Sequence, residues 1–250
     1  MQQSSLWTDR LLVWFSCGAA SAVAAKISIE KSDIPVEVCY CDTLKYEHPD
    51  NLRFLHDVER WIGQEIKILC SPRYADIFEV FRGERFIKGP DGAPCTRILK
   101  RDVRIAYSTN GDRHVLGLTA DEADRIKEFD ERNQQIWAEW VLQDAGITKK
   151  DCYRIITEVG IELPAMYRLG YRNNNCIGCV KGGAGYWNKI RRDFPEAFDR
   201  MAALERDLDH ALNRLKKRPV FLDELPKDAG RFEDEDIECG TLCVMEEVYS

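Results

Sequence analysis

Short apolar runs alternate with segments of helical periodicity over the first two-thirds of the chain. Each run is bounded by polar or turn-forming residues, which is typical of buried strands. The runs that predict strands are Leu11–Phe15, Val36–Tyr40, Ile66–Leu69, His114–Leu118 and Ile136–Leu142. Strands that alternate with helices favour an α/β fold with a mainly parallel sheet and helices on both faces.

The segments between these runs carry apolar residues at helical spacing. Residues His48–Ile62 predict a helix with Leu52, Leu55 and Val58 on one face. Thr148 and Asp151 form a capping-box pattern that predicts the start of another helix. Further helices are predicted at Ala19–Ile29, Thr96–Tyr107 and Pro195–Arg218.

The composition of the sequence changes after about Gly160, and Gly170–Gly185 is rich in Asn and Gly. We expect residues 1–160 to form the sheet domain. Residues 161–250 are then expected to form a C-terminal helical lobe that bears cysteines and ends in an acidic tail, packed with the first part as one unit. In parallel sheets, ligands bind beyond the carboxyl ends of the strands. The loops after Phe15, Tyr40 and Leu118 are therefore the expected site.

The first of these loops, from Ser16 to Ser21, consists of small residues between a strand and a helix. Small residues allow close approach of a ligand, and the N–H groups at a helix start favour an anion. Ser16, Gly18 and Ser21 are the candidate binding residues. A tight turn without a ligand explains the same composition. No GxxxxGK[ST] motif occurs in the chain, so this is not the common P-loop.

The loop resembles the PP-loop, SGGxDS, of the adenine nucleotide alpha-hydrolase superfamily. Cys17 and Ala20 stand where that pattern has Gly and Asp. The Asp helps to hold magnesium on a triphosphate, so its replacement leaves both ATP and phosphoadenosine phosphosulfate (PAPS) as candidate ligands. Within this superfamily, Asp42 and Thr43 match an Asp-Thr pair of the PAPS reductase family, and the resemblance places both beside the nucleotide.

A third segment of the same family, Gly-Ile-Arg-x-x-Glu-Ser, resembles the residues from Gly117 to Glu122. Thr119 replaces the Arg of that pattern, and Arg125 is the candidate to supply the missing phosphate contact. The resemblance therefore adds Gly117 and Arg125 to the predicted nucleotide site.

The ten cysteines of the chain favour metal ligation or thiol chemistry, because structural disulfides are rare in a reducing compartment. Cys176 and Cys179 form a CxxC pair, and Cys95 lies in a Pro-Cys-Thr-x-x-Leu-Lys segment. This combination resembles iron–sulfur members of the PAPS reductase family, which include sulfonucleotide reductases and DNA phosphorothioation enzymes. A [4Fe–4S] cluster is expected, with zinc as the alternative, since thiolates serve both.

The family's reductases carry two adjacent cysteines at the position of Cys95, so a fourth ligand is open. Cys239 and Cys243 belong to an acidic tail that partly matches the Glu-Cys-Gly-Ile-His tail of PAPS reductases. Cys239 is the candidate nucleophile and Cys243 the candidate fourth ligand. Ligand roles for both, or no role, stay open.

Net charge and hydrophobicity bear on the partners and the location that we expect for the protein. A net charge of −7 argues against general nucleic-acid binding, although a nucleic acid as sulfur acceptor stays open. No apolar run is long enough to span a membrane, and the first ten residues are polar, so we expect a cytoplasmic protein.

The resemblance implies either reduction of a sulfonucleotide with a thioredoxin-like reductant or ATP-dependent sulfur transfer to an acceptor. The alternative is an accessory nucleotide-binding subunit of a mobile-element or defence system, with altered or lost catalysis. The replacements at Ala20, Thr119 and the tail favour that alternative.

Overall fold

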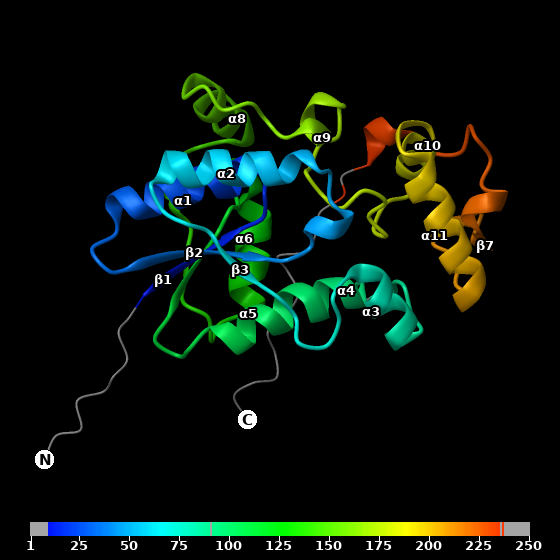
Figure 1. Cartoon of the computed structure of the whole chain (residues 1–250), viewed down its shortest axis with the longest axis horizontal. Coiled ribbons are helices and arrows are strands. Elements are labelled where there is room, and N and C mark those ends of the chain that lie inside the picture. Colours follow the sequence, from blue (N-terminus) through cyan, green and yellow to red (C-terminus); the bar gives the residue numbers. More distant parts are fainter. Residues whose placement is uncertain (1–9, 91, 236, 238–250) are drawn as a thin grey trace, which may run out of the picture.

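The computed structural model describes residues 10–90, 92–235 and 237 of the chain (Figure 1). Within these residues the fold is α/β, and the central sheet has five parallel strands in the order β3-β2-β1-β4-β5. The strands are β1 (Leu11–Phe15), β2 (Val36–Cys41), β3 (Lys67–Leu69), β4 (Arg113–Leu116) and β5 (Ala138–Glu139). The predicted parallel α/β architecture is therefore confirmed.

Helices cover both faces of the sheet because alternate residues of each central strand point to opposite sides. Leu11, Val13 and Phe15 of β1 pack against the first face, whereas Leu12 and Trp14 pack against the second. The helices of the first face are α1 (Ala19–Lys31), α2 (Asp50–Ile62), α7 (Val141–Asp144) and α8 (Lys149–Glu158). Those of the second face are α5 (Asp102–Tyr107) and α6 (Ala123–Arg132).

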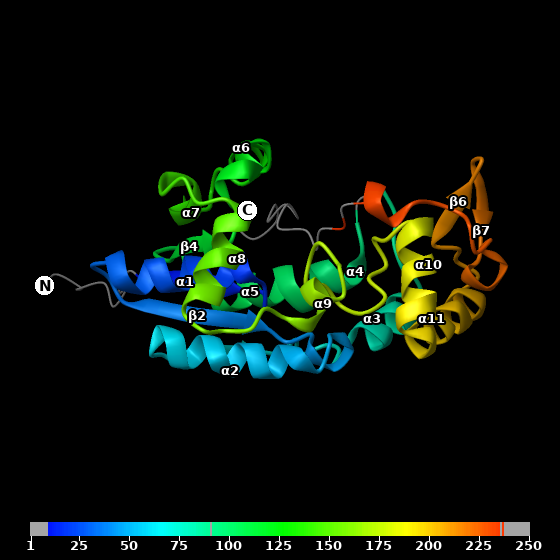
Figure 2. The same cartoon turned by 90° about the horizontal axis from the view of Figure 1, so that it is seen from above.

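A separate hydrophobic core lies beside the sheet, at the right of Figure 1. It joins residues that are far apart in sequence, since Phe81 and Leu99 pack in the same cluster as Trp187 and Phe198. Its helices are α3 (Ile77–Glu84), α4 (Pro94–Thr96), α10 (Ala184–Asp193) and α11 (Pro195–Leu208), and the short α9 (Ala165–Arg168) adds Met166. Figure 2 shows α10 and α11 at the end of the molecule away from the sheet.

Most predicted elements occur with shifts of a few residues. The capping box is present, because Thr148 accepts from the backbone N–H of Asp151 and the Asp151 carboxylate accepts from that of Thr148. The predicted helix at Thr96–Tyr107 is divided into α4, the π-helical turn η2 (Arg97–Arg101) and α5.

Two predicted elements were wrong in extent. The long helix expected at Pro195–Arg218 ends at Leu208, because Asp209 adopts a left-handed conformation with φ of 48°. A hairpin of β6 (Asn213–Leu215) and β7 (Arg218–Val220) follows. The apolar residues of this hairpin happen to continue the helical spacing. The strand expected at Ile136–Leu142 is likewise reduced to the two residues of β5.

In the part of the chain that the structure describes, we find no helix with the length and apolar character needed to cross a bilayer.

Candidate functional site

A pocket of about 180 Å³ opens at the carboxyl ends of β1 and β4, and we call it the strand-end pocket. Its floor includes Ser16, Gly18 and Ser21 from the first loop and Gly117 after β4. Arg125 of α6 also borders it. Five residues that the sequence assigned to one ligand site thus surround one cavity, at the edge of the sheet where the parallel topology placed it.

The loop Ser16–Ser21 is held closed by its own serines. The backbone N–H of Ser16 donates to Ser21 Oγ at 3.0 Å, and Ser21 Oγ donates to the carbonyl oxygen of Gly18 at 3.0 Å. Ser21 is buried and organises the loop from within, whereas Ser16 is exposed. Of the two serines, Ser16 is therefore the better placed to meet a ligand directly.

Gly117 allows β4 to approach the first turn of α1. A Cβ atom at this position would lie 2.7 Å from the backbone nitrogen of Ser21 and 2.8 Å from its Cα. Backbone atoms cannot move aside as a flexible side chain does, so any larger residue pushes the two elements apart. The glycine shapes the pocket through packing of the backbone.

Positive charge is concentrated around the strand-end pocket. Lys100, Arg104, Arg125 and Lys149 border it, together with the carboxylate of Glu122, which forms an ion pair with Arg125. Four cations around one carboxylate favour an anionic ligand. Lys149 also donates to Asn173 Oδ1 at 2.7 Å, which fixes its position in the wall.

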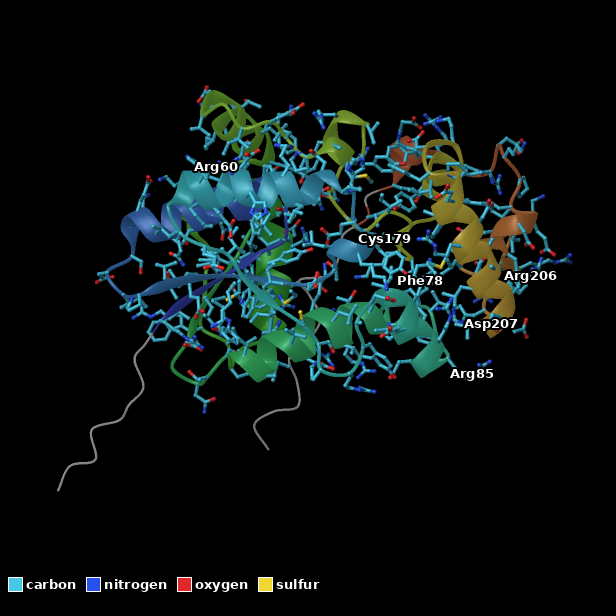
Figure 3. All side chains as sticks on the ribbon, viewed as in Figure 1. Arg60, Phe78, Arg85, Cys179, Arg206 and Asp207 are labelled. Atoms are coloured by element: carbon cyan, nitrogen blue, oxygen red, sulfur yellow. The ribbon has the colours of Figure 1, made fainter. Side chains whose placement is uncertain are left out.

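The three cysteines predicted as metal ligands line a second cavity, which we call the cysteine pocket. Cys95, at the start of the α4–η2–α5 stretch, faces Cys176 and Cys179 across a space of about 20 Å³. Figure 3 shows Cys179 between the sheet and α11, near Phe78 of α3. Segments that are separated by some 80 residues in sequence are thus brought together.

The cysteine pocket fits a metal group only in part. Three thiols are the donor set that zinc and iron–sulfur centres use. Among the described residues, however, no three His, Cys, Asp or Glu side chains are arranged to hold an ion. The space is little larger than a water molecule needs. A single zinc ion requires the thiols to turn inward, whereas a cluster also requires the walls to separate.

The turn that carries Cys176 and Cys179 is pinned by the buried Tyr186 of α10. The Tyr186 hydroxyl accepts from the backbone N–H groups of Gly178 and Cys179, at 3.1 and 2.9 Å, and donates to the carbonyl oxygen of Cys176 at 3.3 Å. Burial raises the pKa of this phenol well above its usual range, so the hydroxyl keeps its proton. Gly178 has φ of +77°, a conformation that favours glycine.

Asp42 and Thr43 are placed differently from the other predicted nucleotide residues. Thr43 borders the cysteine pocket, and its hydroxyl donates to Glu47 Oε1 at 2.6 Å. Asp42 accepts from the backbone N–H of Leu44 at 3.0 Å and borders neither pocket. Its carboxylate therefore caps the turn after β2.

Cys17 occupies a glycine position of the PP-loop pattern and adopts a left-handed conformation with φ of 55°. The side chain is fully buried, and this burial raises the pKa of its thiol well above the usual value. A thiolate is the reactive form of cysteine. Cys17 is consequently a packing residue in this structure.

Cys239 and Cys243 lie outside the described residues. The chain before them is anchored beside the strand-end pocket, because the carbonyl oxygen of Ile237 accepts from Asn173 Nδ2 and Asn175 Nδ2 at 3.0 and 2.6 Å, and both asparagines border that pocket. The carboxylate of Glu235 accepts from the backbone N–H groups of Gly183 and Tyr186 at the start of α10.

Several residues of the strand-end pocket were not predicted from the sequence. Lys100, Arg104 and Lys149 lie in helices and read as ordinary exposed cations, and the three asparagines before Cys176 read as loop residues. The Pro-Cys-Thr-x-x-Leu-Lys segment contains Lys100 and was the one available signal.

Comparison with known proteins adds no family: no protein-family model matches the chain, and no curated protein matches its sequence.

Proposed function

We propose that this chain is an adenine-nucleotide-binding enzyme of sulfur metabolism, similar to the PAPS reductase type. The strand-end pocket holds the nucleotide through its PP-loop, and Cys95, Cys176 and Cys179 hold a metal centre. The observation that carries the proposal is Lys100, which borders both pockets. An anion in one pocket and thiolates in the other thus share a cation.

The nucleotide part of the proposal is supported by the ends of the secondary-structure elements. The first turn of α1, a helix of 13 residues, borders the same pocket as Arg104 and Lys149, and the positive end of a helix favours an anion. Phosphate and phosphosulfate groups both suit such a site, because each is an anion with several acceptor oxygens.

The sulfur chemistry then follows one of two routes. In sulfonucleotide reduction, the Cys239 thiolate attacks the sulfur of PAPS, a sulfur–sulfur bond forms, and the sulfur–oxygen bond breaks with its electron pair on the phosphate. A thioredoxin-like dithiol then reduces the adduct, releases sulfite and becomes a disulfide. In sulfur transfer, ATP adenylates an acceptor with loss of pyrophosphate, and sulfide displaces AMP.

The metal centre is tested by its content and colour. An iron–sulfur centre supplies electrons or sulfide, whereas zinc supplies charge alone. Anaerobically purified protein is expected to absorb in the visible range and to contain iron and sulfide. Cys176→Ser should lower the metal content, and Cys70→Ser, at an exposed cysteine outside both pockets, should not. A colourless protein with stoichiometric zinc contradicts the cluster, and full metal content in Cys95→Ser, Cys176→Ser and Cys179→Ser contradicts the site.

Nucleotide binding is tested separately. We expect ATP or PAPS to bind the wild type, and Gly18→Val to abolish this binding while the protein stays folded. A Cβ at Gly18 already lies 3.2 Å from the Tyr167 hydroxyl, so a branched side chain fills the loop. Equal affinity of Gly18→Val and wild type for both nucleotides overturns the assignment. Binding without turnover of either nucleotide favours the accessory-subunit alternative.

The tail is tested by Cys239→Ser and Cys243→Ser. Loss of metal in either variant identifies a ligand, and loss of turnover with the metal intact identifies the nucleophile. Full metal content and full turnover in both variants exclude both roles.

A further inference from the structure

A chain of buried hydrogen bonds runs from the wall of the cysteine pocket to the loop after β1. Thr43 Oγ1 donates to Glu47 Oε1 at 2.6 Å, and Asn51 Nδ2 donates to Glu47 Oε2 at 2.6 Å. Asn174 Nδ2 then donates both to Asn51 Oδ1, at 2.8 Å, and to the carbonyl oxygen of Cys17, at 2.7 Å. All five residues are at least nine-tenths buried.

This chain fixes the direction of the Asn174 amide. The Glu47 carboxylate accepts only, so Asn51 must turn its nitrogen toward Glu47 and its oxygen toward Asn174. Asn174 then faces two acceptors, Asn51 Oδ1 and the Cys17 carbonyl oxygen, and must present its nitrogen to them. A flipped amide would place oxygen against oxygen twice. The Asn174 oxygen is therefore directed away from both.

Asn174 Oδ1 is left without a partner among the described residues, although the side chain is only 7% exposed. Asn174 borders the strand-end pocket. A buried acceptor without a donor is destabilising, and a ligand that supplies the donor removes that cost. The wall of the pocket thus contains an acceptor that an inorganic anion does not use.

The same pocket also has a buried donor without an acceptor. Arg104 borders it, and its buried Nε has no acceptor among the described residues. The Arg104 guanidinium lies 5.8 Å from the ring centroid of Trp14, which holds it in the wall. A ligand that satisfies both groups carries an anionic acceptor and an O–H or N–H donor on one molecule.

We infer that Asn174 Oδ1 accepts a hydrogen bond from a ribose hydroxyl of the bound nucleotide, an inference that rests on the proposed function. The Asn174 amide nitrogen bonds the Ser16–Ser21 loop directly, through the Cys17 carbonyl oxygen, so the side chain lies beside the expected phosphate position. In a nucleotide the ribose adjoins the phosphates, and the adenine amino group is the most distant donor. Asn174 thereby discriminates against a nucleotide that lacks this hydroxyl.

The test compares dissociation constants for ATP, 2′-deoxy-ATP, 3′-deoxy-ATP and ITP, which lacks the amino group. In the wild type, one of the two deoxy analogues should bind about tenfold more weakly than ATP. In Asn174→Ala that ratio should fall to about one. Asn188→Ala is the matched control, since its amide also bonds two carbonyl oxygens but lies outside the strand-end pocket, and it should keep the ratio.

Three results overturn the inference: equal binding of all four nucleotides by the wild type, an unchanged ratio in Asn174→Ala, or collapse of the ITP ratio alone. Should Asn174→Ala not fold, as judged by its melting curve, Asn174→Ser takes its place, and the wild-type comparison still decides the first of these. If ATP does not bind the wild type and PAPS does not either, the proposed function itself fails. Normal ATP binding without this coupling removes only the role of Asn174.

Discussion

His114 of β4 is buried beside Trp14 of β1, whose indole N–H donates to His114 Nδ1 at 3.0 Å. Burial, with Arg104 nearby, lowers the pKa of this imidazole to about 4. In the unfolded chain the ring takes up a proton near the ordinary value of 6.5. The unfolded chain therefore binds more protons between these two values, and the free energy of unfolding falls as the pH falls through this window.

We expect a loss of about 3 kcal/mol from this residue between pH 7 and pH 4. His114→Gln keeps an acceptor for Trp14 but does not titrate, so its stability should depend less on pH in urea-unfolding curves. Identical pH dependence of wild type and His114→Gln contradicts this account.

At the scale of elements, the close contact between β4 and α1 depends on Gly117. Gly117→Ala should lower the free energy of unfolding by about 2 kcal/mol, because its Cβ meets the backbone of Ser21. It should also weaken nucleotide binding, since the pocket floor moves. Gly18→Ala is the comparison, with its nearest contact at 3.2 Å to a side-chain hydroxyl, and it should cost less. Thermal melting ranks the two, and the reverse order is evidence against this packing role.

The position of the β6–β7 hairpin depends on the side chain of Glu205. Glu205 of α11 is fully buried and accepts from the backbone N–H groups of Leu212 and Leu222, on either side of the β6–β7 hairpin. Glu205→Gln places an N–H against one of these donors and should cost about 2 kcal/mol of stability, with faster hydrogen exchange at both amides. Asp207→Asn changes an exposed charge on the same helix and should do neither. Unaltered exchange in Glu205→Gln refutes the anchoring role.

At the scale of the whole molecule, Lys100 connects the two pockets. Lys100→Met should weaken ATP binding about tenfold and also change the visible spectrum of the metal-loaded protein, because one cation borders both sites. Lys181→Met is the control, since Lys181 borders the cysteine pocket alone. It should leave ATP affinity unchanged. A Lys100→Met variant that affects only one of the two measurements shows that the pockets act separately.

The sequence by itself determined the parallel α/β sheet and the position of the strand-end pocket. Apolar strand runs alternate with amphipathic helices, and parallel strands place their following loops at one edge. Ser16, Gly18 and Ser21 could be chosen on that basis, since they lie between a strand and the next helix, whereas Gly117 was added by the resemblance. Residue spacing did not distinguish the end of α11 from the hairpin, because Leu212 and Leu215 keep helical spacing while Asp209 turns the backbone.

Only the tertiary structure decided which side chains meet. Cys95 and the CxxC pair reach one cavity because α3, α4, α10 and α11 share a hydrophobic core, and that depends on contacts between distant segments. Thr43 was expected beside the nucleotide, but it borders the cysteine pocket. Its hydroxyl is held there by a hydrogen bond to Glu47 Oε1. The direction of the Asn174 amide depends on Glu47, Asn51 and the Cys17 carbonyl oxygen together. The order of residues in the sequence does not predict such a network, because the orientation of each side-chain amide depends on the partner that the tertiary structure places beside it.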